Sequence, residues 1–342
     1  MATASNRPPA NAFVKAVRKV YNPIGFTKGY NFILFFIFAG ALLGFTLARF
    51  QYLSYNGIFC GENAQNFDCY YYDKSTVERA GIIIHLAAIL PAGFLACFQF
   101  VPAIRHKVMI FHRLSGYIIL LLSLVSTAGA LMTGRHSFGG GLDVQVVVGV
   151  LGIMFVGSLA ISYYNVKRLQ LEQHRAWMLR AWFYAGSIIT SRIALISIAT
   201  LTSGQGYHLP ISCDQLASQY LIGSQAETIE RFPECEAYFS GVNPGEVVPV
   251  EGDMGDAGGA PGARVALNLG FGAAVWLALF IHAVGVEFYI QLTPAESERL
   301  RNVSYQRQVE AGMKHPGRAG LTADRIGDSA IWVPEQEKSS NT

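Results

Sequence analysis

Residues 31–48 read NFILFFIFAGALLGFTLA and contain no charged side chain over eighteen positions. A helix needs about 20 apolar residues to cross the hydrocarbon core of a bilayer. Five further predominantly apolar runs have comparable length: residues 80–104, 110–133, 142–166, 176–200 and 265–292. These runs are continuous, unlike the alternating pattern of barrel strands, and a helix satisfies its own backbone hydrogen bonds in lipid. The sequence therefore predicts an all-α polytopic membrane protein with six transmembrane helices.

The composition agrees with a membrane protein. The chain has 342 residues, of which 51% are hydrophobic and 14% are charged. Soluble globular proteins carry about 25% charged residues. The net charge is +3 and no segment forms a basic domain, so the sequence excludes a nucleic-acid-binding protein and predicts the lipid bilayer as the main partner.

Six spans place both ends of the chain on one side of the bilayer. That side carries nineteen of the 26 lysines and arginines, including Arg7 near the N-terminus. Lys and Arg in short loops favour the cytoplasmic side. We therefore expect an integral protein of an endomembrane or the plasma membrane, with both termini cytosolic. The predicted organisation is a cytosolic segment 1–30, a membrane domain 31–292 with external loops 49–79 and 203–263, and a cytosolic tail 293–342, of which the last 30 residues are expected to be solvated.

The external loops contain four of the five cysteines. Cys60 and Cys69 lie between the first two spans, and Cys213 and Cys235 lie between the last two. Disulfides persist in oxidising compartments, so these cysteines predict disulfides on a lumenal or extracellular side, although their pairing stays open. Residues 241–262 are rich in Gly and Pro and poor in apolar side chains, which favours a flexible loop.

Polar side chains inside the spans are the candidate functional residues. The predicted depths place His112, His174 and His282 toward the cytosolic side. His85, His136, Asp143 and Arg192 fall toward the opposite side. Arg192 lies deep in the fifth span, where an arginine needs a partner, and we expect Asp143 to supply it. Small residues recur at helical spacing on spans two, three and five, which predicts a four-helix core of spans two to five.

Two sequence elements carry a family resemblance. His112-Arg113 with Gly116 gives His-Arg-x-x-Gly, and His174 opens His-x-x-Trp-Met-x-Arg. Together with His85 upstream and Arg192 downstream, they resemble a family of predicted multi-pass integral membrane proteins whose function is unassigned. The resemblance covers about residues 81–197. It implies an architecture and favours His85, His112, His174 and Arg192 over His136 and His282, without implying a reaction.

The four-helix core with histidines near the membrane edges also resembles transmembrane di-haem cytochromes of the ascorbate-reductase type. This resemblance implies a membrane oxidoreductase or electron carrier with haem b on histidine pairs. His112 with His174 would serve one face, and His85 with His136 the other. A transition-metal site is an alternative, because imidazole suits zinc, copper or iron, with His112, His174 and His282 as ligands.

Two further classes of function stay open. The chain is alternatively a membrane-embedded enzyme or accessory protein that acts on a lipophilic small molecule in lipid or secondary-metabolite biosynthesis. In that hypothesis His85 is a proton donor and Arg192 stabilises charge on the substrate. A transporter or a structural membrane protein is the third class. The sequence disfavours a transporter because it has no paired interrupted helices in matching halves.

Overall fold

The computed structural model describes residues 11–61 and 66–334. Within these ranges, six helices are long and apolar enough to cross a membrane. They are α2 (Gly29–Arg49), α4 (Thr76–Gln99), α6 (Met109–Thr133), α7 (Leu142–Lys167), α8 (Leu171–Thr202) and α12 (Gly259–Gln291). The prediction of an all-α protein with six membrane-spanning helices is confirmed. Arg7 and the last eight residues of the expected tail lie outside the described residues.

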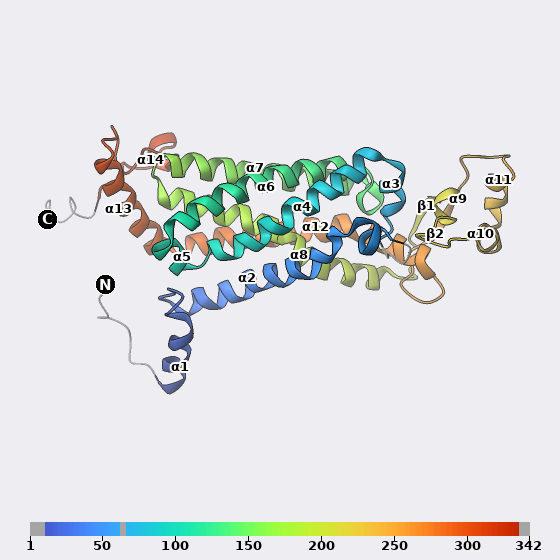
Figure 1. Cartoon of the computed structure of the whole chain (residues 1–342), viewed down its shortest axis with the longest axis horizontal. Coiled ribbons are helices and arrows are strands. Elements are labelled where there is room, and N and C mark those ends of the chain that lie inside the picture. The colour runs from blue at the N-terminus through green and yellow to red at the C-terminus, as the bar shows by residue number, and fades with distance from the viewer. Residues whose placement is uncertain (1–10, 62–65, 335–342) are drawn as a thin grey trace.

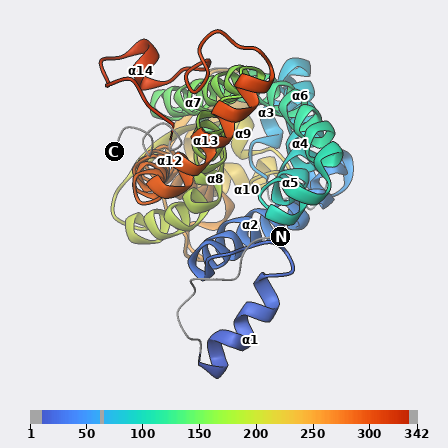
Figure 2. The ribbon, with the colours of Figure 1, turned by 90° about the vertical axis from the view of Figure 1, so that its left-hand side faces the viewer.

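Short elements gather at the two ends of the bundle (Figure 1). One end, which we call the terminal end, carries α1 (Ala12–Tyr21), α5 (Pro102–Lys107), α13 (Pro294–Glu310) and α14 (Ala323–Ile326). The opposite end, which we call the loop end, carries α3 (Cys69–Lys74), α9 (Cys213–Leu216), α10 (Gln225–Arg231), α11 (Glu236–Phe239) and the strands β1 (His208–Ser212) and β2 (Val247–Glu251). Figure 2 looks onto the terminal end, where α1 projects away from the bundle.

The core is built from five helices rather than four. α4 packs along α6, while α8 packs along both α7 and α12. Val275, Leu279 and Val286 of α12 are buried in the largest apolar cluster, together with residues of α7 and α8. The predicted four-helix core of spans two to five is therefore corrected: the sixth span belongs to it. α2 lies outside this core against α4 and α8 (Figure 2).

Glycines allow a close contact between α4 and α6. A Cβ at Gly81 of α4 would lie 2.9 Å from the carbonyl oxygen of Gly129 on α6. A Cβ at Gly129 would lie 2.6 Å from the carbonyl oxygen of Gly81. Any larger residue at either position would push the helices apart, because small residues set how closely backbones approach in lipid.

The second loop of the loop end is folded, which corrects the expectation of a flexible segment over residues 241–262. β1 and β2 pair antiparallel, with Leu209 opposite Val250 and Ile211 opposite Val248. Val248 and Val250 alternate inward and are buried against the disulfide between Cys213 and Cys235. The alternation spans only five residues and includes a proline, so its strand signal is weak. The disulfide compensates for the small apolar core.

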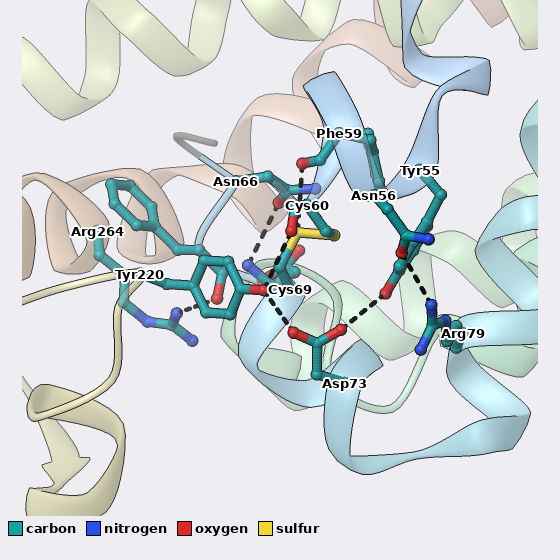
Figure 3. Close-up of a disulfide and its surroundings, with 12 residues drawn as sticks. Tyr55, Asn56, Phe59, Cys60, Asn66, Cys69, Asp73, Arg79, Tyr220 and Arg264 are labelled. Atoms are coloured by element: carbon teal, nitrogen blue, oxygen red, sulfur yellow. Dashed lines mark hydrogen bonds between the residues drawn. A yellow bond between two sulfur atoms is a disulfide. The ribbon is translucent and has the colours of Figure 1, made fainter. Parts of the chain in front are cut away.

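The other disulfide joins Cys60 to Cys69 in the first loop (Figure 3). The hydroxyl of Tyr220 in the second loop donates to the carboxylate of Asp73 and lies 3.3 Å from the carbonyl oxygen of Cys60. Tyr55 donates to the same carboxylate at 3.2 Å (Figure 3). The two disulfide loops therefore form one structured cap over the loop end. The expected disulfides are confirmed, and the structure decides their pairing.

The segment after the sixth span is ordered as far as residue 334, and residues 316–322 pack against the bundle, which corrects the expectation of a solvated tail for that part. Most of residues 323–333 are exposed. α13 lies against α8. Its Arg301 pairs with Asp324 at 2.7 Å, and the indole of Trp332 donates to Glu298 at 3.0 Å. Gln170, at the turn between α7 and α8, is fully buried and donates to the carbonyl oxygen of Gly317 at 3.0 Å. These buried polar contacts explain why a charge-rich segment is ordered.

Candidate functional site

His85 and His174 are held in the same way at opposite ends of the bundle. The ring Nδ1 of His85 lies 3.0 Å from the carbonyl oxygen of Ser126 and 2.9 Å from its hydroxyl. The Nδ1 of His174 lies 3.2 Å from the carbonyl oxygen of Ser162 and 2.8 Å from its hydroxyl. In each case the Nδ1–H donates to a neighbouring helix, which fixes the tautomer and leaves Nε2 available.

His112 and His282 differ from each other in their bonding. The Nδ1 of His112 is buried and has no hydrogen-bond partner among the described residues. His282 has both ring nitrogens engaged: Nδ1 donates to the carbonyl oxygen of Phe183 at 2.7 Å, and Nε2 accepts from the Thr190 hydroxyl at 2.7 Å. A neutral histidine with both nitrogens engaged has no lone pair left for a metal.

The expected metal ligands do not come together. His112 and His174 lie within electrostatic range of each other at the terminal end. His282 of α12 instead forms hydrogen bonds with Phe183 and Thr190 of α8. Among the described residues, no group of three or more His, Cys, Asp or Glu side chains could hold a metal ion.

Arg192 has a different partner from the one expected. Its guanidinium lies over the rings of Phe138 and Phe271, at 4.9 and 5.2 Å from their centroids. The two rings are stacked with centroids 3.7 Å apart. Asp143 instead lies against Gly272 of α12, and no ion pair joins it to Arg192 in the described part of the chain. The expectation failed because depth along a helix does not fix the direction of a side chain.

A buried charged group at the loop end was missed in the sequence. We call it the loop-end cluster; it consists of Asp68, Tyr71, Glu78, His136 and Arg264. The Nδ1 of His136 lies 2.6 Å from Oε1 of Glu78, which is buried. Tyr71 stacks flat on the imidazole of His136, with centroids 4.4 Å apart and planes at 7°. The carboxylate orients the imidazole and the tyrosine ring covers one of its faces.

Arg264 is the most buried large side chain of this cluster, with 1% of its surface exposed. Its Nη1 donates to the carbonyl oxygen of Phe67 at 2.7 Å. With the amide oxygen of Gln215 turned toward the guanidinium, Nη1 and Nη2 also donate to it at 3.0 and 2.7 Å. Arg264 therefore ties α12 to both disulfide loops.

Asp68 interacts electrostatically with both Arg264 and Arg192. It accepts a hydrogen bond from the backbone N–H of Phe138 at 3.0 Å, where Phe138 has a positive φ of 48°. Burial raises the pKa of Asp68, while the Phe138 amide and the Arg264 and Arg192 guanidiniums oppose that rise. The cluster thus places two acids, Asp68 and Glu78, and the Arg264 guanidinium in a partly desolvated region.

The sequence offered a weak signal for this cluster. Glu78 and Arg264 each lie at the start of a span, where a charge is ordinarily read as solvated. Glu78 is seven residues before His85, so both occupy the face of α4 that meets α6. A carboxylate on the same helical face as a span histidine could have been found from sequence, but its pairing with His136 could not.

The Glu78–His136 pair has the arrangement of an acid–base group. A carboxylate that accepts from Nδ1–H leaves Nε2 free to take up or release a proton. The His136 side chain is 33% exposed, and that of Glu78 is 9% exposed. The imidazole therefore reaches the surface while its orienting carboxylate stays shielded.

Comparison with known proteins confirms the resemblance seen in the motifs. Residues 82–213 match a family described as "Predicted membrane protein (DUF2306)". The match contains His85, His112, His174 and Arg192, and also His136, whereas His282 and Arg264 lie outside it. A protein named "Ava biosynthesis cluster protein G" from Aspergillus versicolor is 24% identical over 323 residues, covering 82% of this chain and 94% of its own. No solved structure matches.

Proposed function

We propose that the chain is a membrane-embedded enzyme or accessory protein that acts on a lipophilic small molecule in secondary-metabolite biosynthesis. The Glu78–His136 pair at the loop end carries the proposal. At the loop end, where α4 begins and α6 ends, a shielded carboxylate is bonded to an imidazole that reaches the surface. This arrangement suits proton transfer to a molecule that arrives through the bilayer. The name of the Aspergillus relative supports a place in a biosynthesis cluster.

Each residue has a distinct role in this proposal. Nε2 of His136 exchanges the proton, and Glu78 holds Nδ1–H and stabilises the imidazolium that forms. Arg192, on its stacked aromatic rings, favours negative charge that develops on the substrate. His85 lies deeper on the same face of α4 and is a candidate proton donor through Nε2, once that nitrogen has taken up a proton.

The test compares metabolites in the organism that encodes the chain. Deletion of the gene should remove or change a metabolite, and Glu78→Gln and His136→Gln should reproduce the deletion at unchanged protein level. The matched control is His208→Gln, because His208 is an exposed histidine at the same end. Wild-type metabolite levels in both Glu78→Gln and His136→Gln cells would contradict the proposal, as would a deletion with no metabolic effect.

A b-type haem or metal electron carrier is the second candidate. Two observations favour it. The Nδ1 of His174 is bonded to a carbonyl oxygen, as in histidines that bind a metal through Nε2, and the Nδ1 of His112 has no partner among the described residues. His112 and His174 would hold the group, which would supply one-electron chemistry. A purified sample expressed with haem should then show a Soret band, and His112→Ala with His174→Ala should abolish it. A colourless, metal-free wild-type protein would reject this candidate.

We also propose that the terminal end faces the cytosol and the loop end faces the lumen or the exterior. Both disulfides lie at the loop end, and most lysines and arginines lie toward the other end. The protease experiment in the Discussion tests this orientation.

A further inference from the structure

We infer that the terminal end holds an anion site, formed by Arg105, Arg175 and His112, for the phosphate or diphosphate group of an amphiphilic molecule. The three side chains come from α5, α8 and α6. α5 lies at the terminal end of the bundle, and α3, which carries Tyr71 of the loop-end cluster, lies at the loop end (Figure 1). The inference goes beyond the proposed function, because the acid–base pair does not require it.

The first observation is a set of buried donors with nothing to bind. Nε of Arg105, Nη1 of Arg175 and Nδ1 of His112 are shielded from solvent and have no hydrogen-bond partner in the described part of the chain. An unsatisfied buried donor costs about 1–3 kcal/mol, and more when it is charged. Buried polar groups are nearly always bonded, so two unbonded guanidinium N–H groups, together with an imidazole nitrogen that can carry a proton, indicate a missing acceptor.

The second observation is an excess of positive charge. Burial lowers the pKa of Arg105; Glu296 raises it, and the guanidiniums of Arg175 and Arg299 lower it further. Glu296 is already bound by Arg299, whose Nε and Nη2 donate to its two oxygens at 2.8 and 2.7 Å. Three guanidiniums therefore share one carboxylate, and within residues 11–61 and 66–334 no ion pair is formed by Arg105 or Arg175.

The surroundings fit a phosphate group. Arg175 is already oriented, because its Nη2 donates to the Thr293 hydroxyl at 3.1 Å and its guanidinium lies 5.6 Å from the ring centroid of Tyr289. Thr293 directly precedes α13, so the N-terminus of a 17-residue helix adds partial positive charge. Arginine forks match phosphate oxygens in geometry and charge.

The apolar part of the ligand would lie in the bilayer beside α6. The turn of α6 that carries His112 exposes Ile110, with 82% of its surface accessible, and Leu114, with 62%. An alkyl or prenyl chain on these side chains would leave its phosphate level with Arg105. A molecule with both parts fits this boundary better than a free inorganic ion does.

Binding to the purified full chain in phosphatidylcholine nanodiscs tests the inference. The probes are dodecyl phosphate, inorganic phosphate, inorganic pyrophosphate and, as an uncharged control, dodecanol. Arg105→Gln and Arg175→Gln should each weaken dodecyl phosphate binding about tenfold or more, because each removes a charged bidentate donor. Arg113→Gln is the matched control, since it removes the same charge from an exposed position near His112.

The outcomes separate the possible sources of the anion. Tight binding of dodecyl phosphate with weak binding of the inorganic ions supports an amphiphile, and equal binding supports a soluble phosphate compound. The inference is overturned if no phosphate probe binds, or if Arg113→Gln weakens binding as much as Arg105→Gln. Melting temperatures without probe check folding, and both site variants should match or exceed wild type because they relieve repulsion between cations. Glu78→Gln should leave phosphate binding unchanged.

Discussion

Removing the disulfide between Cys213 and Cys235 should open the second loop to protease from one side of the membrane only. The bond closes a separation of 22 residues. Loop-closure entropy for that length corresponds to about 3.4 kcal/mol at 25 °C. In Cys213→Ala/Cys235→Ala, the equilibrium for local opening of the loop should therefore rise by up to roughly 300-fold.

Trypsin reports this opening at a single position. Arg231 is the only lysine or arginine between residues 203 and 263, and it lies inside the closed loop. The assay adds trypsin to sealed vesicles of known orientation and follows the fragment that ends at Arg231. The double variant should be cut much faster than wild type from the lumenal or extracellular face, and not from the cytosolic face.

The matched control is Cys97→Ala, because Cys97 is a free buried cysteine in α4. It should leave the cutting rate unchanged. A double variant that is cut within about threefold of the wild-type rate would refute the reasoning on loop closure. Cutting at Arg231 from the cytosolic face would refute the orientation, and with it the proposed placement of the loop-end cluster. The bond between Cys60 and Cys69 closes only 9 residues and should stabilise less, about 2.6 kcal/mol.

Three further predictions concern buried positions. Gly129→Ala should lower the melting temperature, because its Cβ would lie 2.6 Å from a carbonyl oxygen of α4. The control Gly149→Ala should leave the melting temperature unchanged, because a Cβ there has no atom within 4 Å. Equal effects of the two variants would contradict the close helix contact. His282→Ala should lower the free energy of unfolding by about 1–2 kcal/mol, because two hydrogen bonds are lost, and should leave the metal content unchanged. A loss of bound metal would contradict a purely structural role for His282. Burial raises the pKa of Asp68 in the folded state, so its contribution to stability is greatest below the unfolded carboxyl pKa of about 3.9 and falls as pH rises through the raised value. As the pH is raised, the melting temperature of Asp68→Asn should therefore fall less than that of wild type. The control Asp253→Asn should not reduce the fall in melting temperature, because hydrogen bonds from the Gly255 amide and the Ser203 hydroxyl lower the pKa of Asp253.

The candidate sites show where sequence reasoning stops. In the sequence, His85 lies within the second span, His112 opens the third and His174 precedes the fifth. In the structure His85 lies in α4, and His112 and His174 each lie in the first turn of a long helix, α6 and α8. Glu78 and His136 are 58 positions apart, and only the packing of α4 against α6 brings them together. Arg264 directly precedes the sixth apolar run, and only the structure shows that it is buried under both disulfide loops.

The sequence by itself determined the six spans and the oxidisable loop cysteines. Each span follows from the summed transfer free energy of one contiguous run, because a helix satisfies its own backbone in lipid without its neighbours. Tertiary structure alone decided the five-helix core, the disulfide pairing and the partner of each buried charge. Helices in lipid gain no hydrophobic energy from one another, so small contacts such as Gly81 on Gly129 fix their rotation. The rotation of each helix determines which polar side chains meet, and it cannot be predicted from hydropathy.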